Sequence, residues 1–333
     1  MKSAALVLLA VLAAHVSAAG DKAYLFSYFT DKAYGGRKGE AAGLHLAYSY
    51  DGLKWTALNG DRPLLVPEVG KDKLMRDPSL VRGPDGTFHL VWTSSWHDRI
   101  IGYASSKDLF NWSGQRAIPV MEHEPEARNS WAPELTWNPD DGRFYIYWAT
   151  TIPGRHSPIP GMEAKEDKLN HRIYMTSTKD WKDFAKTRIW FNPGFSAIDA
   201  ALVRVEGGEK KWLMVVKNEN HTPVEKNIRT VWIDDLSKDV PVDGVSRPIT
   251  GNWVEGPAPL AVGESIIVYF DCYRRHCYGA VRGDDKGRTW RDISGEISMP
   301  KGMRHGTALA VDKDFVDTLV AADAARAGTS GVR

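Results

Sequence analysis

Hydrophobic residues recur along this chain in short runs bounded by turns rich in Gly, Asp and Pro. Five of the runs are rich in aromatic residues and have the length of buried strands: residues 24–29, 88–93, 144–149, 212–216 and 266–270. Another short strand follows each of them: residues 44–49, 100–105, 172–177, 228–233 and 278–282. The pattern predicts an all-β fold built from repeated units.

A polar motif precedes four of the aromatic runs, and a fifth motif lies near the end of the chain. The motifs are Arg76-Asp77-Pro78, Trp131-Ala132-Pro133-Glu134, Ile198-Asp199-Ala200, Glu255-Gly256-Pro257 and Arg304-His305-Gly306-Thr307. They are separated by 50 (305 minus 255) to 68 (199 minus 131) residues, which suits four-stranded blades. We therefore expect a five-bladed β-propeller in which the motifs converge at one end of the central channel.

Four units also contain a turn in which an Asp is followed four or five residues later by an aromatic residue. The pairs are Asp51 and Trp55, Asp108 and Trp112, Asp180 and Phe184, and Asp285 and Trp290. An Asp side chain can bond the backbone of its own turn while the aromatic ring fills the space between sheets. The unit near Asp234 lacks this pattern.

The two ends of the chain complete each other. Only one strand, residues 308–311, fits after the last motif, whereas the N-terminal region has strands without an opening motif. Both ends are expected to share one closing blade, which leaves no exposed sheet edge. The boundaries are a signal peptide at 1–18, the propeller at 19–320 and a frayed tail at 321–333. The insertion at 153–169 is expected to be a loop over the rim of the site.

The signal peptide has a basic Lys2, an apolar run at 4–12 and a small-residue end at 16–18. It predicts a secreted or periplasmic protein, which we expect to be a monomer. The two cysteines, Cys272 and Cys277, are too few for a disulfide-framed scaffold. They form either one local disulfide after export or two free thiols.

Charge and aromatic content indicate the class of substrate. Lys and Arg number 43 against 42 Asp and Glu, so no strong field attracts nucleic acid or an anionic membrane. The 13 Trp and 12 Tyr offer flat faces for sugars, although each Trp can equally be part of the core. A neutral oligosaccharide or polysaccharide is the expected partner.

Three carboxylates, Asp77, Asp199 and Glu255, occupy matched positions in the repeat. Glycoside cleavage needs an acid that protonates the departing oxygen and a second carboxylate that activates water or attacks the sugar. A third carboxylate beside the acid raises the pKa of that acid. The alternative is that these carboxylates only cap strands or pair with arginines.

The ordered motifs resemble those of glycoside hydrolase family 43, over nearly the whole expected mature chain. The resemblance implies an inverting enzyme with Asp77 as general base, Asp199 as modulator of the acid and Glu255 as general acid. His305 resembles the axial histidine that helps to hold a water-shelled calcium ion in many members, and no other cofactor is implied. The strands before Asp77 depart from the usual arrangement, and the shared blade absorbs them.

Further residues near the motifs are candidates for sugar contacts, each with a structural role as the alternative. The residues expected to stack on sugar rings are Trp96, Trp131 and Trp253. Those expected to hydrogen-bond sugar hydroxyl groups are Asn129, Glu134, Arg274 and Arg304. The most specific expectation is an inverting, exo-acting α-L-arabinofuranosidase, with β-xylosidase and β-galactofuranosidase as alternatives within the family.

Three other readings compete. A retaining fructan hydrolase is suggested by Arg76-Asp77-Pro78, but its nucleophile and acid motifs are absent. A sialidase is suggested by the turn at Asp285, but the near-neutral charge offers no arginine cluster for a sugar acid. A sugar-binding propeller without catalysis would not need three axial carboxylates, because burying them together costs stability.

Overall fold

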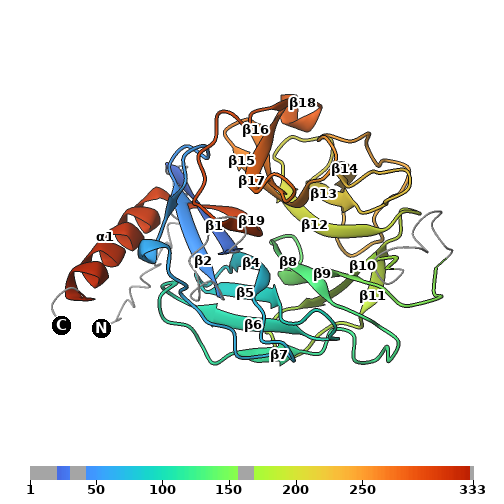
Figure 1. Ribbon diagram of the computed structural model, residues 1–333, viewed down its shortest axis with the longest axis horizontal. Coiled ribbons are helices and arrows are strands. Elements are labelled where there is room, and N and C mark those ends of the chain that lie inside the picture. Colours follow the sequence, from blue (N-terminus) through green and yellow to red (C-terminus); the bar gives the residue numbers. More distant parts are fainter. Residues whose placement is uncertain (1–20, 31–42, 157–168, 331–333) are drawn as a thin grey trace, which may run out of the picture.

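The computed structural model describes residues 21–30, 43–156 and 169–330. Five sheets stand in a ring around a common centre (Figure 1). The chain is an all-β, five-bladed β-propeller, as the repeat predicted, with one helix near its C-terminal end.

Within each blade the strands are antiparallel and hydrogen-bonded in chain order, apart from the closing blade. Blade 1 consists of β4 (Arg76–Arg82), β5 (Phe88–Thr93), β6 (Ile101–Ser106) and β7 (Arg116–Ile118). Blade 2 consists of β8 (Trp131–Asn138), β9 (Arg143–Thr150), β10 (Arg172–Thr178) and β11 (Arg188–Phe191). Blade 3 has three strands, β12 (Ala197–Arg204), β13 (Trp212–Asn218) and β14 (Asn227–Ile233). Blade 4 consists of β15 (Glu255–Val262), β16 (Ser265–Cys272), β17 (Cys277–Asp284) and β18 (Thr289–Asp292).

Blade 5 is built from both ends of the chain. Its order is β19 (Met303–Asp312), β1 (Lys22–Thr30), β2 (His45–Ser49) and β3 (Thr56–Ala57). The register runs from Lys22 opposite Asp312 to Thr30 opposite Met303. The shared closing blade is therefore confirmed, and pairing between the two ends closes the ring.

The hydrophobic core is divided into five clusters, one at each junction between neighbouring blades. Along β9, Tyr145 and Tyr147 belong to the cluster shared with blade 3, whereas Ile146 and Trp148 belong to the cluster shared with blade 1. Successive side chains of a strand point to opposite faces. Both faces are buried here, which explains why the second strands read as continuous apolar runs.

The Asp turns form as expected in three blades. The Oδ1 atoms of Asp51, Asp108 and Asp180 each accept two backbone N–H bonds, of 2.7–3.0 Å, from residues two and three positions ahead. The turn at Asp285 differs, because residues Asp285–Gly287 form a 3-10 turn, η4. A second 3-10 turn, η2 (Asn59–Asp61), follows β3.

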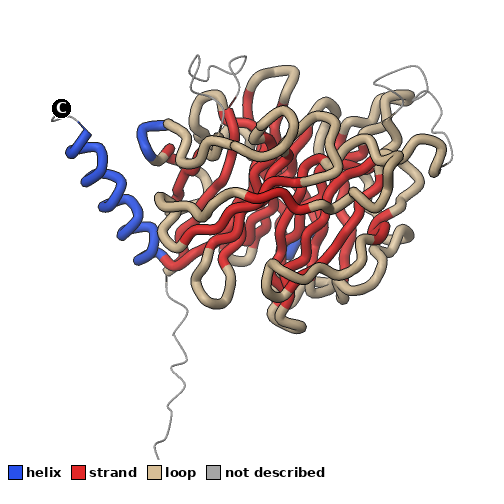
Figure 2. The backbone as a smooth tube through the Cα atoms, turned by 90° about the horizontal axis from the view of Figure 1, so that it is seen from below, coloured by secondary structure: helices blue, strands red, loops and turns tan. Residues whose placement is uncertain are grey.

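The expectation of a frayed tail from residue 321 was wrong. Helix α1 (Lys313–Ser330) follows β19 directly and leans away from the ring (Figure 2). Val316 and Leu319 are buried in the cluster between blades 5 and 1, and Asp323 accepts the backbone N–H of Asn59 at 3.0 Å. These contacts explain an ordered helix that the sparsely apolar sequence after residue 320 did not indicate.

Two expectations fall outside the described residues. The signal peptide at 1–18 lies there entirely, and the insertion at 153–169 lies there for the most part. No helix within the described part of the chain is both long and apolar enough to cross a bilayer. Cys272 and Cys277 lie opposite each other on β16 and β17, and both are free thiols.

Candidate active site

A β-bulge lies at the polar motif of every innermost strand. The pairing register shifts after Arg76, Trp131, Ile198 and Glu255, and His305 is left unpaired opposite β1. The next residue has a positive φ in the first four blades: Asp77 (52°), Ala132 (46°), Asp199 (52°) and Gly256 (59°). Because a bulge redirects side chains, residues from different blades can meet at the axis.

Asp77 of blade 1 meets His305 of blade 5. The Nδ1 atom of His305 lies 3.2 Å from Oδ1 of Asp77, and Thr93 donates its hydroxyl to Oδ2 at 2.9 Å. Burial opposes both charges, but Asp199 and Asp77 raise the pKa of His305 to about 9. The same ion pair overcomes burial and lowers the pKa of Asp77 to about 2. Asp77 is therefore an ionised carboxylate at neutral pH.

Glu255 of blade 4 lies between two cations. Its Oε1 atom is 2.8 Å from the Arg304 guanidinium, and its Oε2 atom is 3.2 Å from the Lys217 ammonium. Arg304 also pairs with Asp271, and Lys217 with Glu219 at 2.6 Å. Burial alone favours the neutral acid, but Lys217 and Arg304 hold the pKa of Glu255 below its usual value.

Asp199 of blade 3 completes a cluster of three carboxylates with Asp77 and Glu255, the carboxylate cluster. It is 7% exposed, and its Oδ2 atom accepts the backbone N–H of Gly256 at 3.0 Å. Burial raises the pKa of Asp199 to about 6, against the opposing charges of His305 and Lys217. Asp199 thus brings a carboxyl group close to the first residues of β15.

The charge state of the carboxylate cluster differs from what was expected, namely that a neighbouring carboxylate keeps Glu255 protonated. In the structure Glu255 has two ion pairs, whereas Asp199 has the raised pKa. The physical reason is the position of Lys217, a buried cation that the expectation did not include. The free protein therefore holds Glu255 as a carboxylate at neutral pH.

Glu134 lies deeper in the channel than was expected of a residue that binds sugar. It is 3% exposed and accepts the hydroxyl groups of Ser79 and Thr307, each at 2.7 Å. Burial raises the pKa of Glu134 to about 7, although these two hydrogen bonds oppose the rise. The carboxyl group joins three innermost strands, β4, β8 and β19, so the structure favours a role in holding the channel together.

Two tryptophans form an aromatic wall beside Asp77. Trp96 is 45% exposed, and Trp131 donates its indole N–H to the Trp96 carbonyl oxygen at 2.8 Å. Their rings meet edge to face with centroids 6.1 Å apart. The guanidinium of Arg76 lies 4.6 Å from the ring centroids of both Trp96 and Phe29. This wall offers an accessible apolar surface next to the motif of blade 1.

A second aromatic group borders Glu255. Trp253 is partly exposed, meets Tyr273 edge to face and lies under the guanidinium of the exposed Arg274. The ammonium of Lys217 lies 5.1 Å from the ring centroid of Tyr273. Trp253 and Arg274 thus lie near the carboxylate cluster, and Arg304 contacts it directly through Glu255.

Asn129 has a different environment from the other candidates. Its side chain is fully buried, donates to the Ala149 carbonyl at 3.2 Å and accepts the backbone N–H of Thr151 at 3.0 Å. The amide therefore fixes the start of β8 against β9. The structure favours this positioning role over contact with sugar.

The residues around His305 do not fit a directly bound calcium ion. The imidazole is held protonated by Asp77 and Asp199, and a protonated imidazole is not a metal ligand. Among the residues that the structure describes, no three His, Cys, Asp or Glu side chains are grouped as metal ligands. The water-shelled calcium implied by the family resemblance stays a prediction.

Sequence reasoning missed three polar residues that lie opposite the motifs on neighbouring strands. Thr93, Lys217 and Asp271 pair in register with Arg76, Ile198 and Glu255, respectively. Thr93 ends its apolar run, and Lys217 and Asp271 directly follow theirs. A polar residue at the end of such a run was therefore the available signal. Lys217 is 1% exposed and Asp271 is 0% exposed, and both take part in the ion pairs around Glu255.

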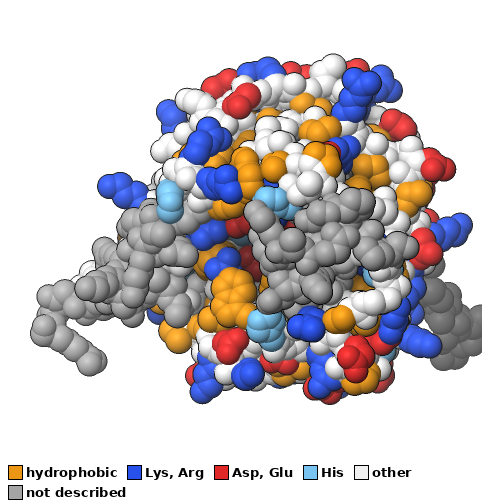
Figure 3. Space-filling model, turned by 45° about the vertical axis from the view of Figure 1, so that its right-hand side comes forward, with side chains coloured by type: hydrophobic (Ala, Val, Ile, Leu, Met, Phe, Trp, Pro, Cys, Tyr) orange, Lys and Arg blue, Asp and Glu red, His pale blue; other side chains and the backbone are white. Residues whose placement is uncertain are grey.

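On the face shown in Figure 3, basic and acidic side chains are not gathered into separate areas. Basic, acidic and hydrophobic side chains are interspersed there. This distribution agrees with the net charge of +1 and with a site whose charges are paired internally.

Comparison with known proteins adds a family to this geometry. Residues 21–317 match the family-43-related model described as "Probable glycosyl hydrolase domain". An α-L-arabinofuranosidase of Bifidobacterium longum subsp. longum is 23% identical over 212 residues, which cover 57% of this chain and 19% of that protein. The chain thus spans less than a fifth of the length of this curated relative.

Solved structures share the fold. A thermostable family-43 glycoside hydrolase superposes with a TM-score of 0.50 at 16% identity, over 69% of this chain and 78% of that one. A subfamily-12 member of the same family, from a capybara gut metagenome, superposes with a TM-score of 0.51 at 16% identity, over 84% of this chain and 48% of that one. At such identities the likeness concerns the propeller alone.

Proposed function

Because this chain belongs to the family-43-related glycosyl hydrolases and is a glycosidase by that membership, we propose that it is an exported, inverting α-L-arabinofuranosidase that removes terminal sugars. The observation that carries the proposal is the convergence of Asp77, Asp199 and Glu255 from three blades. Asp199 is held next to Glu255, since it accepts the backbone N–H of Gly256, the residue after Glu255.

Asp77 is the proposed general base. A base must be ionised in the free enzyme, and the ion pair with His305 keeps it so at neutral pH. Its side chain retains 12% exposure, so water can reach it. The base takes a proton from water as that water attacks the anomeric carbon, and inversion follows from attack on the face opposite the leaving group.

Glu255 is the proposed general acid, with Asp199 as the group that adjusts its pKa. In the free protein Glu255 is ionised, so its proton must be taken up before or during substrate binding. A sugar ring that enters beside Glu255 displaces water and raises the pKa of a carboxyl group through desolvation. Asp199 adds to that rise while it carries a negative charge.

The choice of arabinofuranose is supported by the near-neutral charge and by the similarity to the B. longum α-L-arabinofuranosidase. β-Xylosidase and β-galactofuranosidase activities remain the alternatives, since the same carboxylates serve all three. Removal of terminal sugars is proposed from the sequence alone, through the insertion expected at 153–169, most of which lies outside the described residues. Export and a monomeric state are part of the proposal.

A panel of nitrophenyl glycosides in furanose and pyranose forms tests the substrate. We expect the highest kcat/KM on α-L-arabinofuranoside, and faster turnover of β-xyloside or β-galactofuranoside would replace it with that alternative. No turnover of any glycoside, together with measurable sugar binding, would favour a sugar-binding propeller instead.

Proton NMR of the first-formed sugar tests the stereochemistry. Inversion is expected, because a base that activates water leaves room for that water between the carboxyl groups, which are then roughly 6.5–9.5 Å apart. Retention would make Asp77 a nucleophile and would favour the fructan-hydrolase-like alternative.

A further inference from the structure

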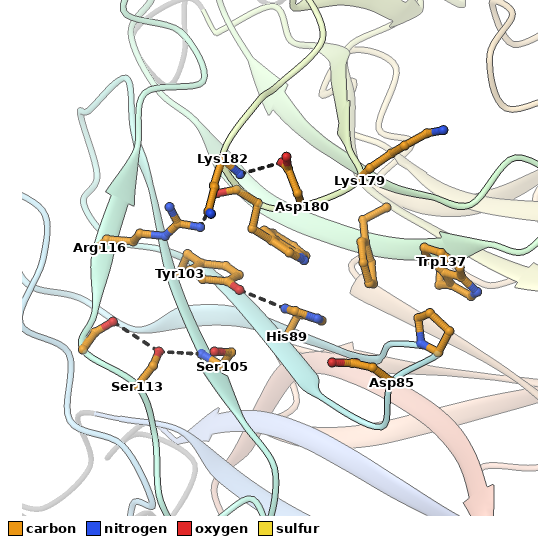
Figure 4. A pocket seen from close by; sticks show the side chains of 14 residues that line it. Asp85, His89, Tyr103, Ser105, Ser113, Arg116, Trp137, Lys179, Asp180 and Lys182 are labelled. Carbon is orange, nitrogen blue, oxygen red and sulfur yellow. Dashed lines mark hydrogen bonds between the residues drawn. The ribbon is translucent and has the colours of Figure 1, made fainter.

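A cavity lies on the face of the ring opposite the carboxylate cluster of Asp77, Asp199 and Glu255. It has a volume of about 670 Å³ and lies between blades 1 and 2 (Figure 4). Its lining includes Asp85, beyond the end of β4, and Trp137, near the end of β8. Those same strands begin at Arg76 and Trp131, next to the carboxylate cluster. Because the strands have seven and eight residues, the cavity and the cluster are roughly 20 Å apart.

Aromatic rings make up the floor of this far-face cavity. Trp181 stacks on both Tyr103 and His89, with centroid distances of 4.4 and 4.6 Å, and Phe144 lies 4.7 Å from both His89 and Trp137. Burial lowers the pKa of His89 to about 4, so this ring is neutral at neutral pH. The floor is therefore aromatic and uncharged.

One polar group in this floor has no partner. Trp181 is 6% exposed, and its indole N–H has no hydrogen-bond acceptor among the described residues. A buried donor without an acceptor costs free energy. An acceptor brought by a ligand, together with a small movement of the ring, would remove that cost.

The rim of the far-face cavity has an excess of positive charge. Arg116 stacks 4.6 Å from the Tyr103 ring centroid, and Figure 4 shows Lys182 beside it. Arg116 also donates a hydrogen bond to the Trp181 carbonyl oxygen, and within the described part of the chain neither Arg116 nor Lys182 forms an ion pair with a carboxylate. The acidic residues of the rim are already engaged, because Asp85 pairs with Lys107 at 3.1 Å and Asp180 accepts the N–H groups of its own turn.

We propose that the far-face cavity binds a uronosyl unit of an acidic polysaccharide. The ring of the sugar would lie against the aromatic floor, and its carboxylate would bind between Arg116 and Lys182. Aromatic surfaces suit the C–H groups of a sugar ring, and a guanidinium suits a carboxylate. The choice of a carbohydrate rests on the glycosidase assignment, whereas the requirement for an anionic group rests on the two cations.

The test uses two ligands that differ only in the acidic group, methyl β-glucuronide and methyl β-glucoside. Binding is measured by calorimetry on the full chain carrying Glu255→Gln, so that no glycoside is cleaved. We expect the glucuronide to bind at least about tenfold more tightly than the glucoside. The affinity should fall as NaCl is raised, because salt screens charge pairs near the surface.

Variants place the binding at the cavity. Lys182→Ala and Lys182→Glu should weaken glucuronide binding about threefold and more than tenfold, respectively. The exposed Lys182 can be changed without unfolding the protein. Arg116→Gln should weaken binding further, and Lys301→Ala, an exposed lysine outside the cavity, should leave it unchanged.

Three results would overturn the proposal: equal affinity for the two glycosides, glucuronide binding that Lys182→Glu does not change, or sulfate that binds the cavity as tightly as the glucuronide does. Each is independent of the proposed function. In the wild-type protein, hydrolysis of a nitrophenyl arabinofuranoside reports on the carboxylate cluster alone.

Discussion

At the scale of single residues, the charges around Glu255 decide when it can donate a proton. Lys217 contacts one of its oxygens and Arg304 contacts the other. The ionised form of Glu255 is therefore stabilised until substrate displaces water or a cation moves. The proposed acid and base therefore differ in what they need. Asp77 works in its resting ionised form, whereas Glu255 must gain a proton.

Leaving-group dependence separates these two roles. Glu255→Gln should lose roughly 10²–10⁴-fold in rate on an alkyl arabinofuranoside, whose departing alkoxide needs a proton. It should retain much more activity on a dinitrophenyl arabinofuranoside, whose leaving group departs unaided. Asp77→Asn should be poor on both, because neither substrate replaces the base. Equal losses for the two variants on both substrates would refute the assignment and make Glu134 the next candidate for the acid.

Two charge-removing variants should move the alkaline limb of the pH profile of kcat, which reports the pKa of Glu255 in the enzyme–substrate complex, in opposite directions. Lys217→Met removes a cation that stabilises ionised Glu255, so the pKa of Glu255 and the limb should move to higher pH, by about 1. Asp199→Asn removes a negative charge and should move the limb to lower pH. Shifts of the same sign would show that the limb does not report Glu255. The measurement is kcat at saturating substrate from pH 4 to 9.

Glu134 links a buried charge to stability. The pKa of Glu134 is raised from 4.5 to about 7 in the folded protein, so between these values the folded state binds more protons than the unfolded state. The free energy of unfolding therefore decreases as pH rises through this window, on the order of 3 kcal/mol. Glu134→Gln should flatten the change in Tm between pH 5 and 7.5, and an unchanged slope would argue against the raised pKa.

At the scale of elements, the bulge positions catalytic side chains and limits what can replace its residues. Gly256 has a φ of 59°, and a Cβ atom there would overlap the ring of His305. Gly256→Ala should displace His305 from Asp77 and lower kcat at least tenfold, with destabilisation of about 1 kcal/mol or more. Gly251→Ala is the matched control, since no heavy atom lies within 4 Å of the added carbon. Comparable kinetics for the two variants would contradict the positioning role of this bulge.

At the scale of the whole molecule, closure of the ring depends on the last strand. β19 pairs with β1 along its length and carries Arg304 and His305 into the site. Deletion of everything after Met303 should abolish cooperative folding, because it leaves one edge of β1 without its partner strand and the clusters next to blade 5 open. Deletion after Val320 keeps Val316 and Leu319 buried and should fold with a modest loss of Tm. Circular dichroism melts of the two truncations test this, and a cooperative transition in the shorter one would argue against closure.

The sequence alone determined the fold, because its signals are local and repeated. Strand length, apolar runs and turn-forming Asp residues are properties of neighbouring positions, and the predicted second and third strands begin and end within two residues of the observed ones. Repetition also placed Asp77, Asp199 and Glu255 at matched positions. It identified the shared blade from one strand too few at one end and one motif too few at the other.

Only the tertiary structure decided the charge states and the supporting contacts. Lys217 is 38 residues from Glu255 and lies in a different blade, yet the two side chains form an ion pair. Electrostatic coupling depends on distance and burial after folding, and a one-dimensional repeat contains neither. For the same reason the structure showed that Asn129 bonds backbone, that Glu134 lies inside the channel and that residues 313–330 form a helix.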